Sequence, residues 1–244
     1  MKTLIIIPCR MSATRLPGKP LLKINDLSII SHVSKKATEA NIGNVIVATE
    51  DQVIVDDVQK NGFKAILTSN SHKTGTDRVY EALKKSDIKD VNFIMNLQGD
   101  EPAIDVEDII SLNNKMIKNN SNLGTLAANI KDSNQLKNKN IVKVATENNL
   151  KKSNFPKALT FSRSSNKINN IYHHIGVYCY SLDILEKFVK LKQTKNEIEN
   201  RLEQLRAIDN NIDINVSLAK SSPIGVDTEE DYLALKKIME YNKS

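Results

Sequence analysis

The chain has 244 residues, 40% of them hydrophobic, which is enough for one large domain with a sizeable core. No stretch approaches the roughly 18 apolar residues of a membrane span, and the N-terminal apolar run meets Pro8 and Arg10 without a small-residue cleavage site, so we expect a cytoplasmic protein with no membrane partner. The formal net charge of +6 does not indicate a nucleic-acid partner, because only 5% of the residues are aromatic and the lysines are spread along the chain.

The first half of the chain alternates between short apolar runs and segments with helical periodicity. The run from Leu4 to Ile7 is continuous, which is typical of a strand that is buried on both faces in a mostly parallel sheet. The same reading predicts strands at 44–49, 64–68, 91–97 and 123–130, and helices at 28–41, 51–61, 77–85 and 106–118. This alternation predicts an α/β fold built from βαβ units.

The second half of the chain is patterned less regularly. Residues 131–170 contain two strand-like pieces, 141–144 and 158–161, separated by loops rich in Asn and Lys, and this region predicts a smaller inserted sheet. The elements expected after it are strands at 174–180 and 212–218 and helices at 182–191, 195–209 and 229–241. We expect Thr228 to cap the last of these helices.

The predicted helix at 195–209 has an apolar stripe. Its members are Ile198, Leu202, Leu205 and Ile208. The polar residues Glu203, Gln204 and Arg206 lie off that stripe, so we expect them to face a cleft or solvent.

A group of cations follows the first strand. Arg10, Arg15 and Lys19 are spaced along a loop rich in Ser, Thr, Gly and Pro. Open α/β sheets bind ligands at the carboxyl ends of their strands, and three cations at such a place suit a polyphosphate. The loop lacks the common glycine-rich phosphate-binding patterns, because Gly18 is its only glycine. We therefore expect side-chain cations, helped by backbone amides, to bind the phosphates.

Two carboxylates are candidate ligands for Mg²⁺. Asp100 follows the predicted strand 91–97 and stands next to Gly99, which lets a ligand approach the backbone. Mg²⁺ in nucleotide sites is held by one or two carboxylates plus phosphate oxygens. The sequence thus predicts Asp100 as the first metal ligand, with Asp227 as its partner. The turn at 225–228 leaves open that Asp227 is an ordinary turn residue.

Several segments, in order along nearly the whole chain, resemble the sugar-nucleotide cytidylyltransferases. Residues 8–20 look like the signature of that family, and their S-x-T-R-L-P-G-K-P form is closest to members that act on the sugar acid 3-deoxy-manno-octulosonate (Kdo). The other matching segments are 72–78, 96–102, 161–163, 174–178, 202–206 and 225–228.

The resemblance implies a fold and a reaction. The fold is the Rossmann-like nucleotide-diphospho-sugar transferase fold, an α/β architecture with a mostly parallel mixed sheet and a smaller inserted sheet. A single domain would span residues 1–244, with a smaller sugar-binding and dimerisation lobe at about 131–180. The implied enzyme is a homodimer that uses Mg²⁺ to convert CTP and Kdo into CMP-Kdo and pyrophosphate for lipopolysaccharide synthesis.

The resemblance also implies roles for residues at the matching positions. The implied catalytic residues are Arg10, Lys19, Asp100 and Asp227, of which Asp100 and Asp227 would bind the metal. Those implied to bind CTP are Arg10, Arg15, Lys19, Thr74, Gly75, Thr76 and Arg78. Those implied to contact the sugar acid are Gln98, Arg163, His174, Glu203 and Gln204. These roles agree with the chemistry of phosphoryl transfer, which depends mainly on positioning and charge neutralisation.

The sequence departs from the family pattern mainly on the sugar side. The loop after Arg163 is short, a Pro-Leu-Glu expected before the helix at 195–209 is replaced by Asn196-Glu197 without the proline, and Cys9 stands where alanine is usual. The alternative substrates are therefore another acidic sugar, such as a nonulosonate or 8-amino-Kdo. A non-catalytic nucleotide-binding regulator is the alternative from a different class. The joint presence of Lys19, Asp100 and Asp227 argues against that reading.

Overall fold

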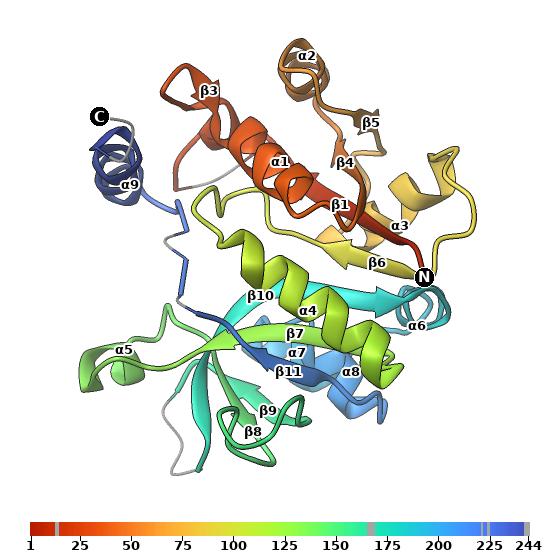
Figure 1. Cartoon of the computed structure of the whole chain (residues 1–244), viewed down its shortest axis with the longest axis vertical. Helices are drawn as coiled ribbons and strands as arrows, with labels where there is room; N and C mark the ends of the chain where they lie inside the picture. The colour runs from red at the N-terminus through yellow and green to blue at the C-terminus, as the bar shows by residue number, and fades with distance from the viewer. Residues whose placement is uncertain (13–14, 165–168, 221, 224, 242–244) are drawn as a thin grey trace. The chain divides into compact units, whose positions relative to one another are not determined.

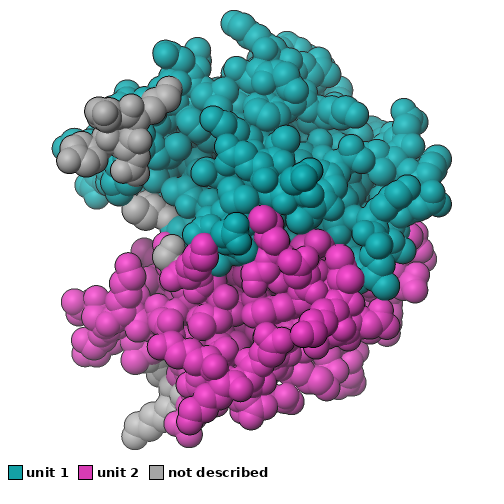
Figure 2. Space-filling model, viewed as in Figure 1, with its two compact units in different colours: residues 1–109, 223–244 teal, residues 110–222 magenta. Residues whose placement is uncertain are grey.

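The computed structural model describes residues 1–12, 15–164, 169–220, 222–223 and 225–241. Figure 2 shows the chain divided into two compact units, residues 1–109 with 223–244 and residues 110–222. The N-terminal unit therefore includes the end of the chain, and helix α4 (Val106–Asn119) begins in one unit and ends in the other.

The N-terminal unit is built on a parallel sheet. Strand β1 (Thr3–Cys9) pairs with β4 (Gly43–Thr49) on one side and with β6 (Phe93–Asn96) on the other, and β5 (Ala65–Leu67) pairs with β4. The side chains from Leu4 to Ile7 have no exposed surface. The prediction that the first strand lies buried in the middle of a parallel sheet is confirmed, because β1 has a parallel neighbour on both edges.

Helices cover both faces of this sheet. Figure 1 shows α1 (Ile29–Glu39) in front of β1 and β4 and α3 (Gly75–Lys85) behind them. Helix α2 (Gln52–Lys60) packs on β4 and β5. A short hairpin of β2 (Lys23–Ile24) and β3 (Leu27–Ser28) leads into α1.

The ends of these helices follow ordinary capping chemistry. Ser28 and Thr74 accept hydrogen bonds from the amides of Ser31 and Asp77, which fixes the first turns of α1 and α3. In the described part of the chain, no helix has the length and apolar character needed to cross a bilayer.

The closing helix α9 (Glu229–Tyr241) belongs to the N-terminal unit. Thr228 caps it as predicted, since its Oγ1 accepts the amide of Asp231 at 3.2 Å. Val226 and Leu235 are fully buried in one apolar cluster with Ile24 and Ile29. This packing attaches the end of the chain to the elements that follow β1.

The second unit contains a mixed sheet. Strand β7 (Leu123–Ala128) pairs in parallel with β11 (Asn215–Leu218) and antiparallel with the long β10 (Ile171–Ser181). The antiparallel pair β8 (Lys143–Thr146) and β9 (Ala158–Ser162) continues from the start of β10. The weakly patterned region thus forms the expected additional strands, and the expected α/β fold class with a mostly parallel mixed sheet is confirmed.

The short helices of the second unit are α5 (Ser133–Lys137), α6 (Leu182–Phe188), α7 (Lys195–Asn200) and α8 (Leu205–Asp209). The single helix predicted for 195–209 was wrong, because the chain leaves the helical path after α7. Arg201 adopts φ 53°, and the amide of Leu202 bonds to the carbonyl of Glu197 at 3.2 Å. A left-handed residue followed by such a bond is a Schellman-type helix end.

The predicted exposure of that segment was only partly right, since Leu202 and Leu205 are buried as expected. Ile198, expected on the apolar face, is 59% exposed, whereas Arg206 and Gln204 are buried. Arg206 binds the Glu197 carboxylate with two hydrogen bonds, Nε to Oε2 at 2.8 Å and Nη2 to Oε1 at 2.5 Å. A continuous helix would break this buried pair, so the tertiary contact overrides the helical periodicity.

Candidate active site

A cavity of about 360 Å³ opens in the N-terminal unit where β1 and β6 end. Parallel strands place their carboxyl ends at one edge of the sheet, which is where open α/β folds bind ligands. Many of the residues predicted for nucleotide and metal binding line it: Arg10, Arg15, Lys19, Thr74, Gly75, Arg78, Asp100 and Asp227. Gln98, predicted to contact the sugar acid, lines the same cavity, whereas Thr76 is buried and is not among the lining residues.

Asp100 and Asp227 meet at one ammonium group. Lys19 Nζ donates to Asp100 Oδ2 at 2.7 Å and lies 3.5 Å from Asp227 Oδ1. Arg15 Nη2 lies 3.1 Å from Asp227 Oδ2. The amide of Val226 also donates to the carbonyl of Asp100 at 3.0 Å, so the two turns are joined through their backbones. The pairing that the sequence could only suggest is thus present in the fold.

The donor set at this place fits a divalent cation. One positive group already lies within reach of both carboxylates, and Glu101 Oε2 is buried beside them without a hydrogen-bond partner. Burial, followed by the charges of Asp100 and Asp227, raises the pKa of Glu101 to about 8. The described residues contain no group of three or more His, Cys, Asp or Glu side chains able to hold a metal by themselves. Two carboxylates completed by phosphate oxygens and water are the coordination that Mg²⁺ usually takes.

The cationic loop is held by a carboxylate that the sequence reasoning missed. Asp51 Oδ2 accepts the amide of Met11 at 2.7 Å, just beyond β1. Further along, Gly18 has φ 71°, a left-handed conformation that glycine adopts at little cost, and Lys19 opens a short 3-10 helix, η1 (Lys19–Leu21). Nothing in the spacing of Asp51 distinguishes it from an ordinary residue at the start of a helix.

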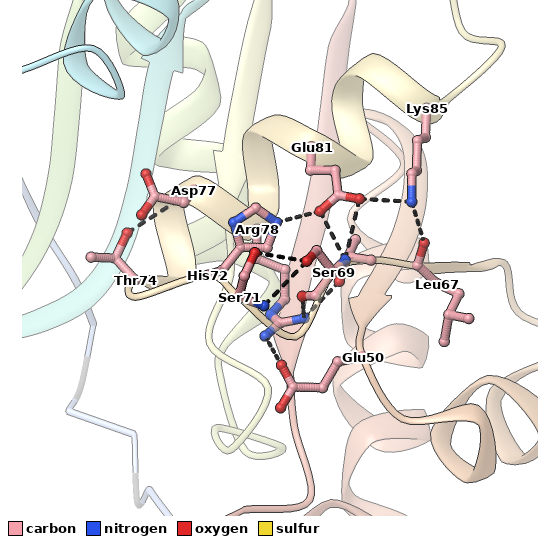
Figure 3. Close-up of polar contacts among 11 residues, drawn as sticks. Glu50, Leu67, Ser69, Ser71, His72, Thr74, Asp77, Arg78, Glu81 and Lys85 are labelled. Carbon is pink, nitrogen blue, oxygen red and sulfur yellow. Dashed lines mark hydrogen bonds and ion pairs between the residues drawn. The ribbon is translucent and has the colours of Figure 1, made fainter.

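Arg78 organises the loop that precedes α3. Its guanidinium donates to Thr68 Oγ1 at 2.6 Å and to the carbonyl of Ser69 at 3.2 Å, and it pairs with the carboxylate of Glu50. Figure 3 shows Arg78 reaching from α3 toward Ser69 and Glu50. The side chain is almost fully buried, so its observed contacts stabilise the loop beside the cavity.

A second side chain of α3 binds the same loop. Glu81 accepts the amide of Ser69 at 2.9 Å and the ammonium of Lys85 at 2.7 Å, and it contacts Nε2 of His72 (Figure 3). Burial opposes ionisation of Glu81, but the bonds from Lys85, His72 and Ser69 prevail and lower its pKa to about 2. The sequence reasoning missed Glu81; its position three residues after Arg78, nearly one helical turn, was the available signal.

The other predicted sugar contacts belong to the second unit. His174 is buried in β10, with Nε2 at 3.0 Å from Thr125 Oγ1, and burial followed by the charge of His173 lowers its pKa to about 3. Arg163 is exposed, and its Nη1 donates to the carbonyl of Lys139 at 3.4 Å. Glu203 Oε1 lies 3.5 Å from Arg206 Nη2, and Gln204 is buried at the start of α8.

Comparison with known proteins shows which family this chain resembles. The model of the cytidylyltransferase family matches residues 4–214. The 3-deoxy-manno-octulosonate cytidylyltransferase of Bartonella bacilliformis is 39% identical, with the match covering 98% of this chain and 99% of that protein. The protein of the same name from Mesorhizobium japonicum is 38% identical, with the same coverage.

Solved structures agree with the sequence comparison. A CMP:2-keto-3-deoxy-manno-octonic acid synthetase complexed with CTP superposes with a TM-score of 0.90 at 33% identity, covering 99% of this chain and 100% of that one. A UDP-glucose pyrophosphorylase shares the fold, with a TM-score of 0.73 at 14% identity over the full length of both chains. The family model covers most of the sequence and the relatives match it from end to end, so the chain belongs to the cytidylyltransferase family.

Proposed function

We propose that the protein transfers the cytidylyl group of CTP to the anomeric hydroxyl of Kdo, giving CMP-Kdo and pyrophosphate. The observation that carries this proposal is the meeting of Lys19, Asp100 and Asp227 in a cavity that is also lined by Arg10 and Arg15. Such an arrangement combines the cations that a triphosphate needs with the carboxylates of a metal site. The full-length similarity to proteins named for this activity supports Kdo as the acceptor.

The cations would work on the leaving-group side of the reaction. Arg10, Arg15 and Lys19 would hold the triphosphate and neutralise the charge that develops on pyrophosphate as the bond to the α-phosphorus breaks. Lys19 is paired with Asp100, and Arg15 is paired with Asp227. Binding of the nucleotide would therefore exchange these partners for phosphate oxygens.

Asp100 and Asp227 would hold Mg²⁺. When bound, the ion would lower the pKa of the attacking sugar hydroxyl and offset charge on the phosphate oxygens. The backbone hydrogen bond from the amide of Val226 to the carbonyl of Asp100 joins the turns that carry the two carboxylates. The protein would thus present a preorganised pair of ligands instead of assembling them on binding.

The sugar acid is proposed to contact Gln98, Arg163, His174, Glu203 and Gln204. Arg163 is suited to the sugar carboxylate, because its planar guanidinium can form two parallel hydrogen bonds with one carboxylate.

We further propose a single cytidylyltransferase domain with a smaller sugar-binding lobe at about 131–180, located in the cytoplasm. Its homodimer interface would lie in the same region, and a monomeric mass by light scattering at enzyme concentrations used for assay would refute the dimer.

Release of pyrophosphate, measured with CTP, Mg²⁺ and a panel of sugar acids, tests the function. We expect release with Kdo and much less with 8-amino-Kdo or a nonulosonate. Release with a nonulosonate alone would assign a different acceptor. No release with any sugar, from a protein that still binds CTP, would reject the enzymatic function.

A further inference from the structure

His72 gives the cavity a hydrogen-bonding group that the triphosphate and metal sites do not use. It lines the cavity, and its Nε2 is bound to the carboxylate of Glu81. Among the described residues, Glu81 is the one hydrogen-bond partner of this ring, so Nδ1 has no protein partner there. Figure 3 shows the ring beside α3, with one nitrogen directed at Glu81 and the other directed away from it.

The location of the proton on this ring follows from the state of Glu81. The carboxylate accepts hydrogen bonds from the amide of Ser69 and the ammonium of Lys85, and its pKa of about 2 means that it carries no proton near neutrality. Glu81 must therefore accept the proton shared with His72. In a neutral imidazole with its proton on Nε2, Nδ1 is a hydrogen-bond acceptor.

The contacts of the segment that carries His72 differ from the ion pairs at the acidic end of the cavity. Thr74 caps α3, and Gly75 lies against Pro8, since a Cβ at Gly75 would be in ordinary van der Waals contact with the proline ring at 3.6 Å. Lys19 and Arg15, in contrast, contact Asp100 and Asp227. With the phosphates assigned to the cations and the metal to the carboxylates, the wall formed by Pro8, His72 and Gly75 is left for the nucleoside.

We propose that Glu81 fixes the tautomer of His72, and that Nδ1 of His72 accepts a hydrogen bond from the exocyclic amino group of cytosine. This inference rests on the proposed function and adds the choice of pyrimidine to it. Uracil presents a carbonyl oxygen at the same ring position, so two acceptors would face each other across the cavity. His72 is then a specificity-determining residue, and Glu81 is a positioning residue that acts through it.

Substitution of Glu81 by Gln gives the sharpest test. A side-chain oxygen of Gln at the position of Oε1 would keep Lys85, which can only donate, and also the amide of Ser69, which lies 3.2 Å from Oε1; the NH₂ group would then face Nε2 of His72. The ring proton would move to Nδ1, which would become a donor suited to the carbonyl of uracil. We expect the CTP:UTP ratio of kcat/KM to fall about tenfold or more, with an absolute rise in turnover of UTP that structural damage would not produce.

Two substitutions of His72 separate its two nitrogens. His72→Gln places its amide near the position of Nε2, which keeps a donor for Glu81 but loses the acceptor at Nδ1, so the preference for CTP should fall. His72→Asn places its amide near Nδ1 and should retain more of the preference. Lys85→Met is the matched control, because it removes an ion pair to Glu81 and leaves the contact with His72, and it should change the ratio less than about twofold.

Binding of CTP and UTP in the absence of sugar, measured by titration calorimetry on folded variants, gives a readout that does not depend on the sugar acceptor. Wild-type protein that prefers CTP in this assay but releases pyrophosphate with no sugar would contradict the proposed function and leave the role of His72 supported. An unchanged CTP:UTP ratio in Glu81→Gln and His72→Gln would overturn the proposal. An equal loss of affinity for CTP and for UTP in these variants would overturn the proposal as well. If His72→Gln does not fold, the CTP:UTP ratio of Glu81→Gln alone tests the proposal.

Discussion

Lys19 and Asp100 form a close ion pair at the end of the central strands, with Nζ at 2.7 Å from Oδ2 and the lysine side chain only 13% exposed. Asp227 approaches the same ammonium at 3.5 Å. The cation and the two carboxylates come from three separate parts of the chain. This relationship links the phosphate-binding loop to the proposed metal ligands.

Replacement of Asp100 by Ala should abolish turnover and leave the protein folded. We expect kcat to fall at least 100-fold, because the proposed metal would lose one of its two carboxylates while Lys19 keeps Asp227 as a partner. Thermal unfolding with CTP, measured with and without Mg²⁺, should show a smaller metal-dependent rise in Tm than in wild type. A variant that turns over normally at ordinary Mg²⁺ concentrations would contradict the role of Asp100. Asp132→Ala, on a carboxylate that caps α5, serves as the control that should keep activity.

Arg206 and Glu197 should stabilise the second unit strongly as a pair. Arg206→Met removes both hydrogen bonds to a carboxylate that is only 4% exposed, and we expect a loss of about 3–5 kcal/mol in the free energy of unfolding. Burial opposes ionisation of Glu197, but bonds from Arg206 and Gln193 hold its pKa below the ordinary value. The double variant Glu197→Leu with Arg206→Met should be less destabilised than the single one. Urea denaturation of Arg206→Met, of Glu197→Leu and of the double variant measures the three losses in the free energy of unfolding. A loss in the double variant equal to the sum of the two single losses would refute the coupling.

His174 should remain neutral throughout the physiological pH range. Its pKa of about 3 lies below the ordinary value of about 6.5 because burial disfavours the charged ring. Between about pH 7 and 3, His174 therefore binds a proton in the unfolded chain but not in the folded chain. The free energy of unfolding should fall as the pH drops through this range. Ring proton shifts followed by NMR should show no titration of His174 above pH 5, with His173→Asn used to assign the signals. An apparent pKa near 6.5 for His174 would contradict the burial.

Gly43 should tolerate no side chain. A Cβ at this position would lie 1.8 Å from the carbonyl oxygen of Thr3, its register partner in the β1–β4 pair. Gly43→Ala should therefore destabilise the protein by about 3 kcal/mol or more. Gly62→Ala is the comparison: φ is 83° there but the space is open, and the cost should be near 1 kcal/mol from the backbone alone. Equal losses of stability, measured by denaturant unfolding, would show that the two strands separate easily.

Much of the N-terminal unit could be predicted from local patterns. Leu4 to Ile7 is an apolar run too continuous for a strand with a solvent face, and the capping residues Thr228 and Ser28 suit the starts of α9 and α1. The cations at 10, 15 and 19 and the carboxylate at 100 follow predicted strands, so their place at one sheet edge follows from βαβ topology. The resemblance to known cytidylyltransferases rests on the same segments.

The tertiary structure decided what depends on contacts between distant residues. Periodicity predicted one helix over 195–209, but the buried bonds between Glu197 and Arg206 require the chain to turn at Arg201. No spacing rule could show that Asp227 meets Asp100 or that Glu81 orients His72, because such pairings form only when the backbone brings separate segments together. Sequence by itself determined the elements and the chemical types at their ends; packing and desolvation determined which of those side chains became partners.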